Sequence, residues 1–407
     1  MQDTSAQAFT GEPVSARDRP PASLTPAFFL ALGTFAIGTE GFMIAPLLPT
    51  IAADVGMSVP LTAMLVVVFT LVLALSSPVS TVLTGGLNRR NTLMAAMVLF
   101  TIGNLCAALS AGFTTLLFAR ILMAIAAGLF VPGANALAGA TVAPGRRGLA
   151  LAIVSGGMTI AIALGLPFGA VVGHAFGWRA TFVMVAAMST VALLGIGLGI
   201  SATTGADLPV ARFRERVSTI AQPAIRRLLT VSLFWSVGAY CAYPYIAPYL
   251  TAVLGFGQQG ITATVTLWGI SAAAGVLTGG HLNDRLGPVR VVRVSLAGLA
   301  AAFLLLSVAS LLPARLALVP ALAAVSVWGF TVWSFFPAQM ARLIAAGPPQ
   351  QGSVALSLNT STMYLGFSIG SAIGAGILDL GLLWGIGALA GLSELVALVL
   401  DMRRKTP

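Results

Sequence analysis

Among the residues that could carry chemistry, one acidic side chain lies well inside a long apolar segment. Glu40 is 14 residues into the run that begins at residue 26, about 20 Å along a helix that rises 1.5 Å per residue. A carboxylate near mid-bilayer costs on the order of 3 kcal/mol, so such residues usually have a function or a partner. Glu40 could carry a coupling proton or recognise a cation; alternatively, it is a structural acid with a basic or polar neighbour.

The other candidates are one buried base and a group of aromatic residues. Arg120 lies inside an apolar segment, where it either pairs or lines water, or extends its side chain outward to the interface. Tyr240 and Tyr243 share a helix face through their i, i+3 spacing and could either stack on a planar ligand or pack in a core. Tyr249 lies nearer the outer end, where tyrosine usually belongs to the interfacial belt. Glu394, in the last apolar segment, is expected at the periphery.

The composition shows which solvent these residues meet. The 407 residues are 58% hydrophobic and 8% charged, whereas soluble domains are about 25% charged. The bilayer must therefore be the main solvent. The single lysine, Lys405, excludes a phosphate-binding loop that ends in Gly-Lys. Intramembrane acids and histidines are too sparse for a membrane enzyme or a metal site.

Apolar runs between charged residues, glycines and prolines predict about twelve transmembrane helices, enough for an all-α membrane protein. If the N-terminus is cytoplasmic, 18 of the 21 basic residues lie on the cytoplasmic side. This bias predicts that both termini are cytoplasmic. The formal charge of +10 then reflects anchoring against anionic lipid, with no need for nucleic acid. The predicted spans are residues 26–51, 59–84, 91–112, 115–139, 148–173, 179–201, 225–251, 260–282, 291–312, 315–342, 352–376 and 381–401.

An internal repeat divides these helices into two sets of six. Val82-Leu83-Thr84-Gly85-Gly86 recurs as Val276-Leu277-Thr278-Gly279-Gly280, and Gly165, Gly169 and Gly173 recur as Gly366, Gly370 and Gly374. Similar offsets at several places predict two parallel halves, and glycines spaced by four let a neighbouring helix approach closely. The predicted organisation is a disordered cytoplasmic tail (1–25), an N-terminal bundle (26–201), a cytoplasmic linker (202–224), a C-terminal bundle (225–402) and a short tail (403–407).

Several segments resemble the major facilitator superfamily, and in particular its twelve-helix drug:proton antiporter branch. The first span from Gly33 to Pro49, with Glu40-Gly41-Phe42, is similar to that of the branch. Gly280-His281-Leu282-Asn283-Asp284-Arg285-Leu286-Gly287 with Arg290 resembles the family's loop motif, and Arg120 resembles its fourth-helix arginine. Gly156, Gly165, Pro167 and Gly169 resemble the fifth-helix antiporter motif, although Leu166 intervenes between glycine and proline. The first loop copy, Gly86-Leu87-Asn88-Arg89-Arg90, lacks the family's acid.

The resemblance implies alternating access by two bundles around a midplane cavity. Glu40 would couple protons, and the gating and motif residues would be Asp284, Arg285, Arg290, Gly165, Pro167 and Gly169. The expected substrate cavity contains Arg120, Tyr240, Tyr243, Trp268, Trp328, Gln339 and Asn359. Each of the last four could equally be a packing or helix-bridging residue.

The sequence therefore predicts a multi-pass protein of a bacterial inner membrane that exports a small amphipathic, drug-like molecule in exchange for protons. Export of a sugar or nucleoside-type metabolite, and a membrane sensor that transports nothing, are the alternatives. We expect no enzymatic activity, cofactor, metal or nucleic-acid partner, and a monomer that binds its substrate and protons within the bilayer.

Overall fold

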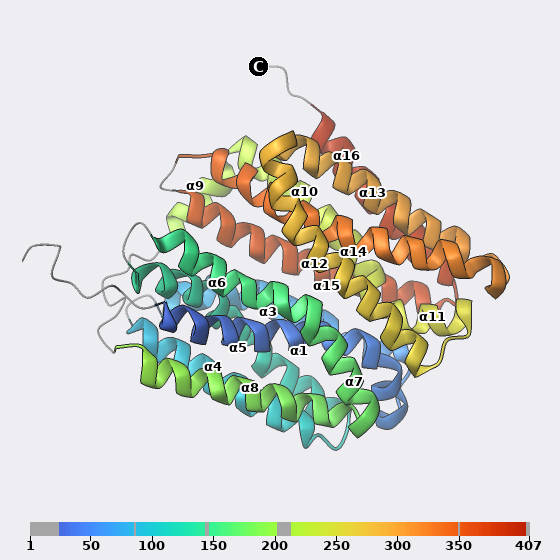
Figure 1. Ribbon diagram of the computed structural model, residues 1–407, viewed down its shortest axis with the longest axis horizontal. Helices are drawn as coiled ribbons and strands as arrows, with labels where there is room; N and C mark the ends of the chain where they lie inside the picture. The colour runs from blue at the N-terminus through green and yellow to red at the C-terminus, as the bar shows by residue number, and fades with distance from the viewer. Residues whose placement is uncertain (1–23, 85–86, 143–145, 202–212, 349–350, 404–407) are drawn as a thin grey trace, which may run out of the picture.

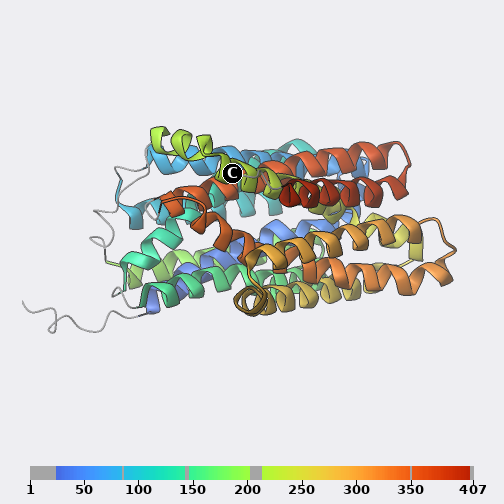
Figure 2. The ribbon, with the colours of Figure 1, turned by 90° about the horizontal axis from the view of Figure 1, so that it is seen from above.

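The computed structural model describes residues 24–84, 87–142, 146–201, 213–348 and 351–403, and in these ranges every regular element is a helix (Figure 1). Most of the predicted N-terminal tail, residues 202–212 of the predicted linker, and all but Arg403 of the C-terminal tail lie outside these ranges. The long helices run along a common axis (Figure 2), as expected for segments that cross a bilayer, where each backbone polar group must be bonded within its own helix.

The first half of the chain folds into one bundle of helices that pack mainly on one another. Its elements are α1 (Thr25–Val55), α2 (Val59–Thr62), α3 (Met64–Leu83), α4 (Arg89–Ala108), α5 (Phe113–Ala140), α6 (Arg147–Ile160), the π-helix η2 (Ala161–Gly165), α7 (Leu166–Phe176) and α8 (Trp178–Gly199).

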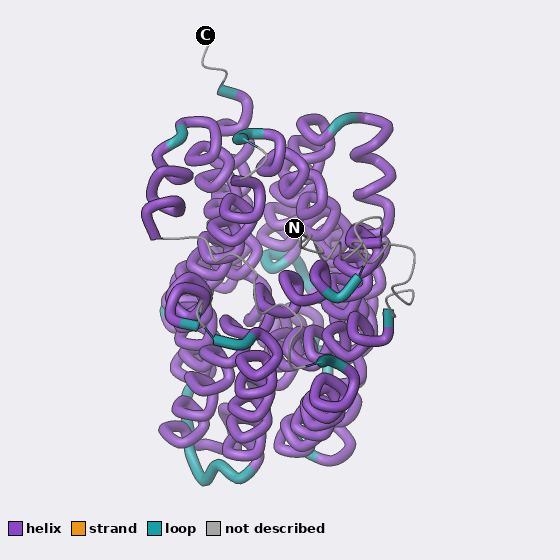
Figure 3. Tube along the Cα trace, turned by 90° about the vertical axis from the view of Figure 1, so that its left-hand side faces the viewer, coloured by secondary structure: helices purple, strands orange, loops and turns teal. Residues whose placement is uncertain are grey.

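The second half forms a second bundle, which follows the short helix α9 (Phe213–Ala221). Seen from the left-hand side of Figure 1, the two bundles lie one above the other (Figure 3). The elements of the second bundle are α10 (Pro223–Ala242), the 3-10 helix η3 (Tyr243–Tyr245), α11 (Ile246–Leu254), α12 (Gln258–Leu286), α13 (Pro288–Ala309), α14 (Ala314–Ala345), α15 (Gly352–Asp379) and α16 (Leu383–Met402).

Eleven helical segments of the described chain are long and apolar enough to cross a membrane. The remaining predicted span, residues 225–251, differs because its helix is interrupted at η3 and continues as α11. Pro244 lies in η3 and has no backbone N–H to donate, so one bond of a regular α-helical ladder is missing at the interruption. The segment ends at Gly255, whose φ of 66° is left-handed, and this is where the sequence predicted a turn.

The repeated glycines make equivalent contacts in the two bundles. Gly165 and Gly169 place η2 and α7 directly against α1, where an added Cβ would collide with Thr39 and Met43. In the second bundle, Gly366, Gly370 and Gly374 bring α15 equally close to α10 and η3. The repeat seen in the sequence is thus a repeat of helix contacts, as close packing through small residues requires.

The two bundles contact each other through α3 with α15, α7 with α12, and α1 with η3 and α11. The Gln258 side chain donates to Thr50 Oγ1 at 3.0 Å, and the Tyr243 hydroxyl donates to the Phe42 carbonyl at 2.9 Å. Thr50 and Gln258 lie at the ends of α1 and α12 that the basic-residue bias assigns to the outer face. The Gln258–Thr50 contact joins the halves on that outer side, and the Tyr243–Phe42 contact joins them nearer the middle of α1.

Candidate functional site

Glu40 and Arg120 form an ion pair inside the first bundle, between α1 and α5. Both side chains are fully buried. Arg120 also donates from Nε to the Leu65 carbonyl at 3.3 Å, and its guanidinium lies 4.0 Å from the centre of the Phe69 ring. The pairing resolves the alternatives for Arg120, because its side chain points into the bundle and does not extend outward.

The contacts around Glu40 explain how the fifth predicted span supports it. Gly165, at the end of η2, packs on Thr39, the residue before Glu40. A π-helix accommodates one additional residue in an α-helix, and such segments are frequent at functional sites. Leu166, the residue that interrupts the family's motif, directly follows η2, and Pro167 lies in the first turn of α7. The local π geometry therefore absorbs an extra residue while the glycines still face α1.

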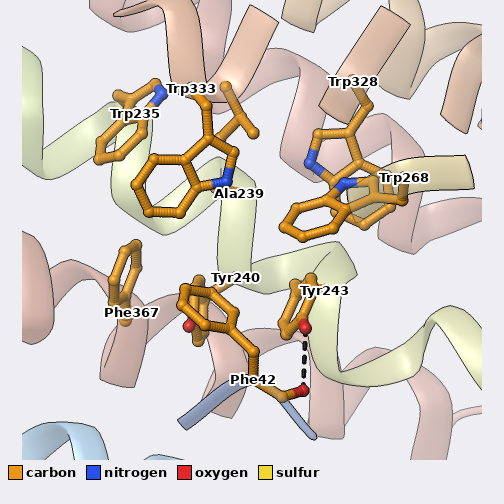
Figure 4. A pocket seen from close by; sticks show the side chains of 10 residues that line it. Phe42, Trp235, Ala239, Tyr240, Tyr243, Trp268, Trp328, Trp333 and Phe367 are labelled. Atoms are coloured by element: carbon orange, nitrogen blue, oxygen red, sulfur yellow. Dashed lines mark hydrogen bonds between the residues drawn. The ribbon is translucent and has the colours of Figure 1, made fainter. Parts of the chain in front are cut away.

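An aromatic cluster lies next to the contact between the two bundles (Figure 4). Four predicted cavity residues, Tyr240, Tyr243, Trp268 and Trp328, belong to it. Phe42 joins them from the first bundle, with ring centres 5.7 Å from Tyr243 and 6.4 Å from Trp268. The remaining lining residues are Trp235, Ala239, Val332, Trp333 and Phe367.

The rings of this aromatic cluster are closely packed. Tyr240 stacks on Phe367 with ring centres 3.7 Å apart, and Tyr243 lies 5.0 Å from Trp268. The space left between the rings is about 10 Å³, which is about enough for one water molecule. A ligand can enter only if the rings separate. Phe42 belongs to α1 and the other rings belong to the second bundle, so relative movement of the bundles would separate them.

The ion pair and the aromatic cluster are neighbours. Tyr240 is close enough to Arg120 for the two groups to interact electrostatically. Phe42 is two residues from Glu40 on the same helix. The structure therefore brings together an acid–base pair from the first bundle and an aromatic surface from the second.

Two predicted cavity residues lie elsewhere. Gln339 donates to the Leu228 carbonyl at 2.8 Å and to Ser232 Oγ at 3.1 Å, and so bridges α14 to α10. Asn359 is buried, and its amide contacts Met340 Sδ at 3.8 Å. Neither residue lines the aromatic cluster. Helix bridging, the alternative left open by the sequence, describes Gln339 in this structure.

The predicted gating residues of the second loop motif are at the surface. Asp284, Arg285 and Arg290 are exposed at the junction of α12 and α13. Among the described residues, no ion pair joins Asp284 to either arginine. A gating role for these residues remains a prediction.

A cluster of charges that the sequence analysis did not identify lies at the inner end of the second bundle. The fully buried Asp401 carboxylate, at the end of α16, pairs with Arg293 of α13 at 2.8 Å and with Arg342 of α14. Arg227 of α10 donates to the Asp401 carbonyl. Four helices thus meet at one residue. Sequence position could not reveal this, because each member lies near a helix end, where charged residues are ordinarily solvated.

Two further expectations are corrected by the structure. Tyr249 is buried, with its hydroxyl donating to the Leu306 carbonyl at 2.7 Å, so it does not belong to an interfacial belt. Glu394, expected at the periphery, is fully buried against Gly238, where α16 packs on α10. The sequence predicted the depth of both residues but not the helix face on which they lie.

Comparisons with known proteins agree with this architecture. The family model for the Major Facilitator Superfamily matches residues 30–371. The chain belongs to the major facilitator superfamily. An MFS-type transporter of Bacillus subtilis of uncharacterised function, YbcL, is 30% identical and covers 92% of this chain and 94% of its own. The inner membrane transport protein YdhP of Escherichia coli K12 is 28% identical over 94% of this chain and 97% of its own.

Two other similarities connect this major facilitator protein to named transporters. A chloramphenicol resistance protein of Streptomyces lividans is 29% identical, with 91% of this chain and 95% of that protein aligned. The crystal structure of the human organic anion transporter MFSD10 superposes with a TM-score of 0.68 at 16% identity, over 94% of this chain and all of the other. At that identity the similarity establishes the fold alone. The protein is therefore a multi-pass membrane transporter of this superfamily.

Proposed function

We propose that this transporter is a proton-coupled antiporter that exports a small amphipathic, drug-like molecule, with Glu40 as the proton carrier. The observation that carries the proposal is the buried Glu40–Arg120 pair beside the contact between the bundles. A fully buried ion pair is stable only while both charges are present. Protonation of Glu40 removes one of the two charges and so weakens the electrostatic attraction between Glu40 and Arg120.

The surroundings of the pair support a coupling role over a purely structural one. Thr39 Oγ1 and Glu40 Oε2 have no hydrogen-bond partner among the described residues. A purely structural ion pair is usually completed by further hydrogen bonds to its remaining oxygens and nitrogens. An incompletely bonded pair requires less energy to separate. A carboxylate that takes up and releases a proton in each cycle must separate from its partner in this way.

The mechanism follows from two states of the pair. In the deprotonated state Glu40 holds Arg120 within the first bundle. In the protonated state Arg120 loses its partner and becomes available to groups of the second bundle, such as Tyr240, with which it interacts electrostatically. The proton and the substrate then favour different states of the transporter, one open to the outside and the other open to the inside. Exchange of the two across the membrane requires this difference.

The experiment uses the purified full chain in liposomes with an imposed pH gradient. Glu40→Gln is expected to abolish proton-driven accumulation of a substrate while it retains substrate-for-substrate exchange, because the amide cannot carry a proton. Glu394→Gln is the matched control, since that carboxylate is equally buried but lies away from the contact between the bundles. Proton-driven accumulation that persists in Glu40→Gln contradicts the proposal.

Substrates for this assay come from a survival screen of expressing cells against a panel of antibiotics. Chloramphenicol belongs in the panel because of the resistance protein described above. An uncoupler should remove any protection that depends on the proton gradient. Protection that is insensitive to the uncoupler contradicts proton coupling.

A further inference from the structure

The aromatic cluster contains hydrogen-bond donors that have no acceptor. The indole nitrogens of Trp235, Trp268, Trp328 and Trp333 are buried, and none has a hydrogen-bond partner among the described residues. All four rings line the same small space. Buried indole N–H groups usually find a partner, and a buried donor without one is costly. Four in one place indicate a site that receives acceptors from outside the chain.

The arrangement of two of these rings makes the point more specific. Trp268 and Trp328 lie 5.8 Å apart between ring centres, at an interplanar angle of 69°. Figure 4 shows their indole nitrogens on the edges by which the two rings approach each other. Two donors that converge without an acceptor between them can be bridged by one oxygen atom. The space in the closed cluster is enough for a water molecule, and a substrate oxygen would replace it when the rings separate.

The charges around the cluster do not favour a cation. None of the residues that line it is acidic. The nearby acid, Glu40, is neutralised by Arg120, and protonation of Glu40 would leave Arg120 as the uncompensated charge. The ring faces could attract a cation, but the N–H edges and the guanidinium oppose it. The unpartnered groups of this region are therefore mainly donors.

We infer that the site takes an uncharged or acidic aromatic molecule that carries hydrogen-bond acceptors, such as nitro, carbonyl or carboxylate groups, and discriminates against lipophilic cations. This inference rests on the proposed export function and narrows its substrate class. Trp268 and Trp328 are the specificity-determining donors. The exclusion of cations sets this site apart from an aromatic cage, in which ring faces alone bind a quaternary ammonium group.

The first test compares two probes of nearly equal size and opposite charge. Binding of tetraphenylborate and tetraphenylphosphonium to the purified full chain is measured by isothermal titration calorimetry, without any gradient. At a pH at which Glu40 is protonated, we expect the anion to bind at least about tenfold more tightly, because Arg120 is then an uncompensated positive charge beside the cluster. Equal or tighter binding of the cation overturns the inference, as does failure of the anion and of an uncharged nitroaromatic amide such as chloramphenicol to bind.

The second test isolates the donors from the shape of the site. Trp268→Phe keeps an aromatic ring but removes the N–H, so it should weaken chloramphenicol binding by about tenfold and change tetraphenylborate binding by less than about twofold, since that anion has no acceptor oxygen. Trp384→Phe, on an exposed part of α16, is the control and should change neither. An equal loss for both probes would show that Trp268 contributes shape alone.

The two proposals can fail separately. Binding measured without a gradient does not depend on Glu40 carrying a proton. Probe selectivity that holds while Glu40→Gln retains proton-driven transport would reject the coupling mechanism alone. Proton-driven export of a lipophilic cation would reject the substrate class and leave the coupling mechanism intact.

Discussion

Glu40 and Arg120 show how a pair of expensive residues can be tolerated in an apolar bundle. Each alone would place an uncompensated charge in a region without water. Together they are neutral, and Arg120 gains a carbonyl acceptor and the face of Phe69. The pair is therefore acceptable to the fold while remaining sensitive to a single proton.

The energetic dependence of the two charges can be measured directly. Arg120→Met should lower the free energy of unfolding by about 3 kcal/mol, because it leaves the Glu40 charge buried without a partner. Adding Glu40→Gln to that variant should restore most of the loss. Thermal and denaturant unfolding of the purified protein in detergent would measure both effects.

Arg179→Met provides the comparison, since Arg179 and Asp54 form a partly exposed pair at the outer end of the first bundle. Its loss should cost at most about 1 kcal/mol. If the loss of stability in the Arg120→Met/Glu40→Gln double variant equals the sum of the losses in Arg120→Met and Glu40→Gln measured singly, the two charges are not coupled.

At this scale the sequence was informative about depth and uninformative about partners. Charge inside an apolar run was enough to select Glu40 and Arg120, but their pairing depends on how α1, α3 and α5 pack. The same limit applies to the aromatic cluster. Phe42 and Trp333 are ordinary apolar residues in the sequence, and only the fold places them beside Tyr243 and Trp268. Gln339 shows the same limit, because the depth of a polar residue does not reveal whether it faces a cavity or a neighbouring helix, and here it bonds to α10.

At the scale of helices, the positions of the spans were predictable and their interruptions were not. Hydropathy and basic-residue bias depend on many residues at once, so they tolerate local irregularity. The π-helix η2 and the 3-10 helix η3 each depend on the bonding of only a few residues. Leu166 was visible as a departure from the family's motif, but an extra residue in a helix can be accommodated in several ways.

The contact between η2 and α1 provides a test of close packing. Gly165→Ala adds a methyl group that collides with Thr39, so we expect a loss of stability of about 1 to 3 kcal/mol and reduced transport. Gly156→Ala, in the preceding helix α6, is the matched control, because an added Cβ there meets nothing within 4 Å. Unfolding in detergent and transport in liposomes measure the two effects. Similar behaviour of the two variants would show that η2 need not lie directly on α1.

For the whole molecule, the division into two bundles followed from the internal repeat, but their relative position did not. A transporter that alternates between openings has one sequence and several arrangements of similar energy. The structure shows the arrangement in which the outer ends of α1 and α12 are joined through Thr50 and Gln258. No pattern in the sequence selects that arrangement over another.

This arrangement predicts a reversible block of transport by a cross-link. Thr50→Cys with Gln258→Cys, in a chain whose Cys106 and Cys241 are replaced by serine, should be joined by a short bifunctional methanethiosulfonate reagent, because the native side chains are in hydrogen-bond contact. The cross-link would hold the outer side closed, so transport in liposomes should stop after treatment with the reagent and return after reduction.

Thr101→Cys with Ser189→Cys is the control pair, since these side chains lie 2.7 Å apart within the first bundle. Its cross-link should leave transport largely unchanged. Continued transport by a fully cross-linked Thr50–Gln258 pair would show that the outer contact does not open during the cycle.

The buried ion pair also has an electrical consequence. With Glu40 deprotonated the pair has no net charge, and with Glu40 protonated it carries the charge of Arg120. A proton that enters from outside would therefore place one elementary charge within the membrane field, where it gains about 2.3 kcal/mol for each 100 mV that it crosses completely. Export of an uncharged molecule would then be driven by the membrane voltage as well as by the pH difference. It would therefore continue when the pH is the same on both sides of the membrane.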